Sequence, residues 1–306
     1  MPTSTAILFP GQGTQAPAMG APWRDHPAWK IVEQAETALD EPLARLLLEA
    51  DANELARTRN SQLSVLLTSL VAWEAARPFV STPVCFAGHS LGQVTALIAS
   101  GAMSLDDGVR FAAARAEATQ AAADAHPGKM AALVGATPEQ ALEACTAAPD
   151  QCWVANDNAD GQVVIAGTPD GVVAVMVRAK EMKLRALPLK VGGAFHTPLM
   201  DDAVPHLVAA LESVAFQPPS APVITNEDAL AHDDADAAEW RARCARHVTR
   251  PVRFRQTLQT VAAYSPTVAL EIGNGEMIAG LAKRTTPELT VIGIGSPAAL
   301  TLIPED

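Results

Sequence analysis

Short apolar runs alternate along the chain with stretches in which apolar residues recur every three or four positions. Ala6–Phe9 and Val84–Ala87 are continuous apolar runs, which predicts two buried strands. After the second run, Leu91, Val94 and Ile98 share one face of a predicted helix. Strands that alternate with amphipathic helices are typical of an α/β protein built on a parallel sheet.

The middle of the chain follows a different order. A strand at Met130–Val134 is followed by a helix from Thr137 and by two paired strands at Cys152–Asn156 and Gln162–Ala166. A helix from Thr168 and a strand at Leu184–Val191 complete the segment. The order βαββαβ is typical of a ferredoxin-like unit. We therefore predict a ferredoxin-like subdomain at residues 130–197, inserted into a larger α/β domain formed by residues 1–129 and 198–306. Further strands are expected near 223–224, 268–272 and 291–294.

Composition narrows the class of protein. The chain has 306 residues, of which 49% are hydrophobic and 18% charged, as in a globular protein with a sizeable core. A formal charge of −12 disfavours nucleic-acid binding through the overall field. No run reaches the ~20 apolar residues of a membrane span. The four cysteines have no paired spacing, which argues against disulfides and zinc and indicates a cytoplasmic location.

The strongest chemical signal is the segment Gly88–Gly92, which matches the pattern G-x-S-x-G around Ser90. It lies between a predicted strand and a predicted helix, the context of the nucleophile elbow in α/β-hydrolase-like domains. Such a turn exposes the serine hydroxyl, and the amides at the start of the following helix can stabilise an oxyanion. The plainer alternative is a glycine-rich turn with an incidental serine, but the flanking strand and helix favour the elbow.

A serine hydroxyl needs a base, and histidine is the usual one. The chain has seven histidines, His26, His89, His126, His196, His206, His232 and His247. Side chains of adjacent residues in such a tight turn point apart, which disfavours His89 as the base. His26, His126 and His232 lie in polar loops. His196 lies in the glycine-rich, proline-bounded loop Gly192–Pro198 after a predicted strand. Spacing alone favours His196 and leaves His206 and His247 open.

Further motifs are spread over nearly the whole chain. They are Pro10–Gly13, Ser61–Gln62, Arg115 within Ala114–Ala116, Asn156–Asn158 with Gly161–Gly167, Gly193–His196 and Gly280–Arg284. Together with the elbow, they resemble the malonyl-CoA:acyl carrier protein transacylases and the acyltransferase domains of polyketide synthases. The combination is specific, although a single glycine motif would be a weak signal.

This resemblance implies a ping-pong acyltransferase. Ser90 would attack the thioester of malonyl-CoA and His196 would take its proton. The resulting malonyl-serine would then pass its acyl group to the phosphopantetheine thiol of an acyl carrier protein. The backbone amides of Gln12 and Leu91 would form the oxyanion hole. Backbone carbonyls would orient the histidine, and neither a metal nor a cofactor is implied. We expect a monomer that does not bind membranes.

The resemblance also implies the substrate residues. Arg115 matches the family's arginine for the malonyl carboxylate, which is costly to bury unpaired. From the residues alone, an exposed arginine on an amphipathic helix, as expected for Arg110, is the plainer interpretation. Phe195 resembles the bulky residue of malonyl-selective members and would leave little room for an α-methyl group.

Three other residues are assigned to the substrate site by the same resemblance. Gln62 corresponds to the family's T-Q pair and Asn158 to its N-x-N segment. Met130 would line the acyl pocket, and its plainer interpretation is a core methionine.

The sequence departs from the family pattern at three places. Gln93 stands where glutamate is frequent, Arg250 where asparagine begins N-P-V-x-W, and Asn274 where proline is usual in G-P-G. The change at Arg250 puts in doubt the local backbone that would support His196 or the acceptor site. None of the three departures falls on a residue to which the resemblance assigns a catalytic role.

Rival interpretations share parts of this evidence. A thioesterase or other acyl hydrolase would use the same Ser90 and His196, and a polyketide or malonate-decarboxylase acyltransferase would use the same fold. A binding module without activity is disfavoured by the intact motifs. Gly11–Ala16 also matches a loose dinucleotide fingerprint, but Pro10 and Pro17 argue against the required turn into a helix.

Arginines crowd one segment near the C-terminal third, at Arg241, Arg243, Arg246, Arg250, Arg253 and Arg255. An acidic carrier protein could dock there, and the opposite charges would then steer its encounter with the protein. The alternative is an ordinary solvated face.

Overall fold

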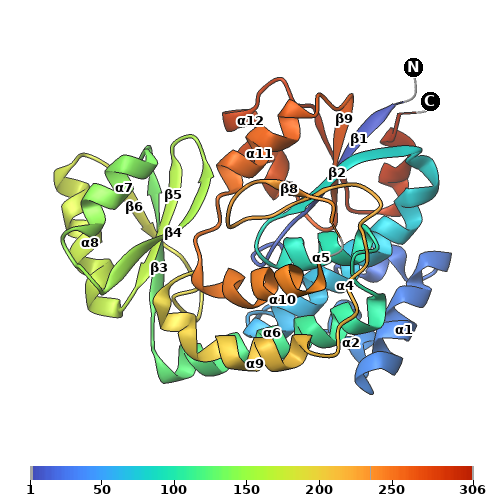
Figure 1. Cartoon of the computed structure of the whole chain (residues 1–306), viewed down its shortest axis with the longest axis horizontal. Coiled ribbons are helices and arrows are strands. Elements are labelled where there is room, and N and C mark those ends of the chain that lie inside the picture. The colour runs from blue at the N-terminus through green and yellow to red at the C-terminus, as the bar shows by residue number, and fades with distance from the viewer. Residues whose placement is uncertain (1–2, 235, 305–306) are drawn as a thin grey trace.

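The chain folds around two β-sheets that form separate units, as Figure 1 shows. The structure is a computed structural model, and it describes residues 3–234 and 236–304. Within these residues, the larger sheet has six strands in the order β10-β9-β1-β2-β7-β8. The strands are β1 Ser4–Phe9, β2 Thr82–Gly88, β7 Val223–Ile224, β8 Ala231–His232, β9 Val268–Ile272 and β10 Val291–Ile294. All neighbours are parallel except β7 and β8.

The central strand β1 of the larger sheet is buried on both faces. Ile7 and Phe9 of β1 pack into one core cluster, and Ala6 and Leu8 pack into another. Helices α4 Thr58–Ala76, α5 Leu91–Ala99 and α6 Leu105–Ala125 cover the first face, and α11 Phe254–Ala263 and α12 Met277–Thr285 cover the second. This coverage explains why the strands read as continuous apolar runs. The expected α/β-hydrolase-like layering with a parallel-dominated sheet is confirmed.

Smaller helices complete the larger unit. The α-helices are α1 Lys30–Leu39, α2 Leu43–Leu48, α3 Ala52–Leu55, α9 Val204–Leu211 and α10 Ala237–Arg246. The 3₁₀ helices are Ala21–Trp23, Pro27–Trp29, Arg77–Phe79, Pro198–Ala203, His247–Thr249 and Pro297–Leu302. Among the described residues, no helix has both the length and the apolar character needed to cross a membrane.

The second sheet is antiparallel, with the order β4-β5-β3-β6. Its elements follow the chain as β3 Lys129–Val134, α7 Pro138–Cys145, β4 Cys152–Ala159, β5 Gln162–Gly167, α8 Pro169–Glu181 and β6 Arg185–Pro188. The βαββαβ prediction is confirmed. The last strand ends at Pro188 rather than at Val191, because the chain turns there into the loop that carries His196. Residues 130–197 remain our proposed boundaries for this unit.

The two units meet at the carboxyl ends of the parallel strands. Val252, which precedes α11, forms a parallel bridge with Asn156 of β4. Its amide donates to the carbonyl of Ala155, and its carbonyl accepts from the amide of Asp157, both at 2.9 Å. This junction holds the small sheet across the end of β2. In open α/β sheets, ligands bind at this end of the strands.

Candidate active site

Ser90 lies at a strained turn between β2 and α5. Its backbone has φ 51° and ψ −103°, a conformation that residues with a side chain rarely adopt. The flanking glycines are required by close packing, because a Cβ on Gly88 would lie 2.1 Å from the backbone of Gly92. A Cβ on Gly92 would lie 2.2 Å from the carbonyl oxygen of Phe9. The spacing of the motif therefore follows from steric need.

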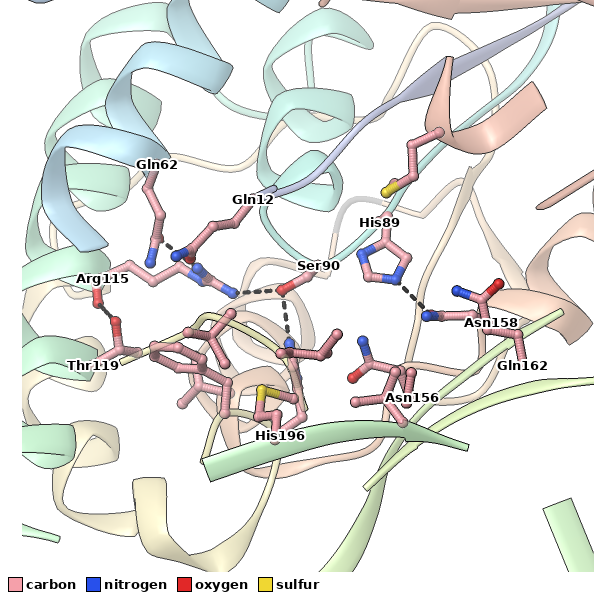
Figure 2. A pocket seen from close by; sticks show the side chains of 18 residues that line it. Gln12, Gln62, His89, Ser90, Arg115, Thr119, Asn156, Asn158, Gln162 and His196 are labelled. Carbon is pink, nitrogen blue, oxygen red and sulfur yellow. Dashed lines mark hydrogen bonds between the residues drawn. The ribbon is translucent and has the colours of Figure 1, made fainter. Parts of the chain in front are cut away.

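His196 contacts the serine directly. Its Nε2 lies 2.7 Å from Oγ of Ser90 (Figure 2). Its Nδ1 lies 3.1 Å from the carbonyl oxygen of His247 and 3.0 Å from that of Arg250. Carbonyl oxygens only accept hydrogen bonds, so Nδ1 carries the proton and Nε2 accepts from the serine hydroxyl. The imidazole is thus oriented as a base by backbone groups alone.

The environment keeps this imidazole neutral. Burial, and then the nearby charge of Arg115, lower the pKa of His196 to about 3. At physiological pH its Nε2 is therefore free to take the proton of Ser90.

The histidines left open by the sequence lie in different places. His206 is exposed on α9. His247 contributes its carbonyl oxygen, while its buried ring packs 5.3 Å from the ring of His196. His89 is turned away from the serine and bonds through Nε2 to Oδ1 of Asn158 at 2.8 Å. The structure brings only His196 of these side chains to Ser90.

Two backbone amides beside Ser90 are available as donors. Leu91 is the first residue of α5, so its amide has no partner within the helix. Gln12 follows β1 and lines the same pocket. Within the described part of the chain, neither amide makes a hydrogen bond. Gly11 permits the close approach of the loop after β1 to the backbone at His89, because a Cβ on Gly11 would lie 2.3 Å from the carbonyl oxygen of His89.

Arg115 reaches the nucleophile from α6 and is only 4% exposed. Its Nη1 donates to Oε1 of Gln62 at 2.6 Å and its Nη2 to Oγ of Ser90 at 3.2 Å (Figure 2). Its Nε has no partner among the residues that the structure describes. Burial lowers its pKa to about 10, so the guanidinium stays charged at neutral pH. No carboxylate pairs with it in the part of the chain that the structure describes. Arg110, by contrast, is exposed on the same helix near Asp106.

The remaining predicted substrate residues line this pocket, namely Gln62, Met130, Asn158 and Phe195. The oxygen of Asn158 is already bonded to His89. Sequence reasoning missed Asn156, which lines the pocket with a buried side-chain oxygen that has no partner within residues 3–234 and 236–304. The N-x-N motif contained the signal, since alternate residues of one strand point to the same face.

The departures from the motif pattern are accommodated by backbone groups or by other side chains. Arg250 holds His196 through its carbonyl oxygen, which does not depend on its side chain. Gln93 accepts a hydrogen bond from the amide of Asn226 at 2.7 Å. Asn274 donates to the carbonyl oxygen of Thr14.

Four of the six arginines that we considered as a carrier dock have partners within the chain. Arg243 and Arg246 pair with acidic side chains at Glu227, Asp228 and Glu239, Arg255 pairs with Asp157, and Arg241 donates to the carbonyl oxygens of Leu211 and Val214. Only Arg250 and Arg253 are exposed with no partner for their side chains among the described residues. Partners distant in the sequence neutralise most of the segment.

No group of three histidine, cysteine, aspartate or glutamate side chains within residues 3–234 and 236–304 is arranged to hold a metal ion. The groups that surround the pocket at Ser90 are the serine hydroxyl, a neutral imidazole, two backbone amides and a buried cation.

Comparison with known proteins agrees with this arrangement. The model of the acyl transferase domain family matches residues 7–292. The chain is 36% identical over 303 residues to the malonyl CoA-acyl carrier protein transacylase of Bacillus subtilis, covering 97% of this chain and 95% of that one. It superposes on the malonyl CoA-acyl carrier protein transacylase of Coxiella burnetii with a TM-score of 0.94 and 28% identity, covering 99% and 98% of the two chains. A malonyl-transacylase solved with a type II polyketide synthase acyl-carrier protein gives a TM-score of 0.93 at 30% identity, with 98% and 99% covered.

Proposed function

Because the chain belongs to the acyl transferase domain family, we propose that it transfers a malonyl group from coenzyme A to the phosphopantetheine thiol of an acyl carrier protein. The observation that carries the choice of malonyl is Arg115. It is a buried cation with no carboxylate partner in the described chain, 3.2 Å from the nucleophile. A malonyl thioester supplies the missing anion three bonds from the carbonyl that Ser90 attacks.

The proposed acylation uses the groups already in contact. Oγ of Ser90 attacks the thioester carbonyl while its proton passes to Nε2 of His196. The amides of Gln12 and Leu91 stabilise the oxyanion of the tetrahedral intermediate. As the intermediate collapses, the C–S bond breaks and His196 returns the proton to the departing thiolate of coenzyme A. The carrier thiol then reverses these steps on the malonyl-serine.

Arg115 favours malonyl because a guanidinium binds a carboxylate through two parallel hydrogen bonds. Gln62 holds Nη1 by its oxygen, which fixes the plane of the guanidinium. An acetyl group would leave this cation buried and unpaired. Phe195 lines the acyl pocket beside it, and the exclusion of an α-methyl group by packing is worth only ~1–3 kcal/mol.

The pocket also has groups suited to a phosphopantetheine arm. The unpartnered oxygen of Asn156 can accept a hydrogen bond from an amide N–H of the arm. Ser90, His196 and Arg115 come from one chain, so a monomer suffices. Four buried free cysteines support our assignment of the cytoplasm.

A transfer assay distinguishes this function from acyl hydrolysis by the same Ser90 and His196. The protein is incubated with malonyl-CoA, and intact mass is then followed with a phosphopantetheinylated carrier, with the unmodified carrier and with buffer alone. We expect malonyl to appear on the phosphopantetheinylated carrier faster than malonate appears in solution. Release of malonate at the same rate in all three mixtures would establish a hydrolase.

A further inference from the structure

Asn226 is a fully buried side chain beside the nucleophile elbow. It follows strand β7, which lies parallel to β2 and pairs Ala87 with Ile224. Because parallel strands end at the same edge of a sheet, Asn226 lies next to the residues that follow β2. It has no place in the proton transfer described above.

The amide group of Asn226 spans the strained turn. Its Oδ1 accepts from the backbone amide of Ser90 at 2.8 Å, and its Nδ2 donates to the carbonyl oxygen of Gly88 at 2.9 Å. Both bonds require this one orientation of the amide, since a backbone amide only donates and a carbonyl only accepts. A backbone at φ 51° and ψ −103° persists only when its surroundings hold it there.

The backbone of Asn226 makes two more bonds that reach both sides of the site. Its amide donates to Oε1 of Gln93 on α5 at 2.7 Å, and its carbonyl oxygen accepts from the amide of Arg253 at 2.9 Å. Arg253 lies at the end of the loop that contains Arg250, and the carbonyl oxygen of Arg250 accepts from Nδ1 of His196. One residue thus connects the turn that carries the nucleophile to the loop that orients the base.

We propose that Asn226 is a positioning residue that keeps Oγ of Ser90 in line with Nε2 of His196. Without its side chain, the amide of Ser90 and the carbonyl of Gly88 lose their partners and the turn can relax. A displacement of about 1 Å at a reacting group can slow a reaction about 10²-fold. Arg115 lies on α6 and Gln62 on α4, and neither belongs to the turn or to α5. The affinity for malonyl-CoA should therefore be retained.

The test compares Asn226→Ala and Asn226→Asp with the wild type. Two reactions of Ser90 are timed, namely coenzyme A release from malonyl-CoA and labelling by a small alkyl fluorophosphonate that carries no carboxylate. Affinity for malonyl-CoA is measured by calorimetry on each variant combined with Ser90→Ala. Asn60→Ala is the matched control, because Asn60 also bonds a backbone carbonyl, that of Glu54, away from the elbow.

We expect Asn226→Ala to slow both reactions about 10²-fold while the Kd for malonyl-CoA changes by less than about threefold. Asn226→Asp keeps an acceptor for the amide of Ser90 and should recover part of the rate. Unchanged rates in both variants, or a loss of affinity as large as the loss of rate, would overturn the proposal. If the alanine variant does not fold, an unchanged rate in Asn226→Asp overturns it alone.

The malonyl-CoA readout rests on the proposed function, whereas the fluorophosphonate readout does not. Slow labelling of the variants in a protein that never accepts malonyl would therefore refute the substrate and leave the role of Asn226 standing.

Discussion

The guanidinium of Arg115 donates to the hydroxyl of Ser90 at 3.2 Å. This contact places a positive charge beside both the nucleophile and its base. It helps to keep His196 unprotonated, and in the proposed reaction it would hold the malonyl carboxylate near the carbonyl that Ser90 attacks. The proposed preference for malonyl therefore depends on this cation.

Replacing Arg115 by alanine should separate malonyl from acetyl. Truncating one partner of a buried, hydrogen-bonded charge pair costs about 3 kcal/mol, or roughly 100-fold in kcat/KM for malonyl-CoA. Use of acetyl-CoA should stay equal or improve, because acetyl makes no pair with the cation. The measurement is the ratio of the two kcat/KM values, with Arg110→Ala on the same helix as the control. An equal loss for both substrates would refute the carboxylate role.

The acid side of the pH profile should be displaced. A free histidine loses its base form below roughly pH 6.5, but His196 has a pKa of about 3. Because the neutral imidazole is the active form, kcat/KM for acylation should stay level from about pH 8 down to about pH 5. Coenzyme A release at constant ionic strength measures this profile. A half-loss near pH 6.5 would show that the imidazole is not shielded as the structure indicates.

His247→Gln should make the fold less sensitive to acid. Burial first, and then neighbouring positive charge, lower the pKa of the His247 ring well below its usual value. Below roughly pH 6.5 the unfolded chain binds a proton there that the folded chain does not, so stability falls as pH falls. Glutamine does not take up a proton in this pH range, and the variant keeps the backbone carbonyl that holds His196. Denaturant unfolding at about pH 7.5 and pH 5 should show a smaller loss for the variant; an identical loss would contradict this account.

Reversing Arg250 and Arg253 to glutamate should weaken use of the carrier. These are the exposed arginines of their segment that lack an internal partner in the described chain, whereas Arg246 is held by Glu227 and Glu239. Loss of steering should lower kcat/KM for the carrier about tenfold at low salt, with the effect fading as salt is added. Acylation by malonyl-CoA should be unaffected, and reversal of exposed Arg57 controls for total charge. Carrier kinetics that do not change at low salt would exclude this surface.

The elements that form the elbow could be predicted because local chemistry determines them. The run before Gly88, the glycines around Ser90 and the periodic residues after it each specify their own conformation. The βαββαβ unit was predictable for the same reason, since its strands and helices alternate with clear turn residues. Family resemblance then supplied the roles that no local pattern contains.

What could not be predicted depends on pairing between distant segments. The two-residue strand β7 gives no sign that it lies beside β2, so the contact of Asn226 with Ser90 was missed. The pairing of Arg243 and Arg246 could not be predicted, because their partners Asp228 and Glu227 lie in a preceding turn. Spacing alone left His206 and His247 open beside His196, because only the folded loop shows which ring reaches the serine.

The most direct test of the central claim is the rapid-quench intact mass of the protein mixed with malonyl-CoA. We predict that the wild type gains one malonyl group, which peptide mapping places on Ser90, and that Ser90→Ala gains none. His196→Ala should gain it about 10²–10⁴-fold more slowly. A malonyl group that forms at the wild-type rate in Ser90→Ala, or that maps to another residue, would contradict the account.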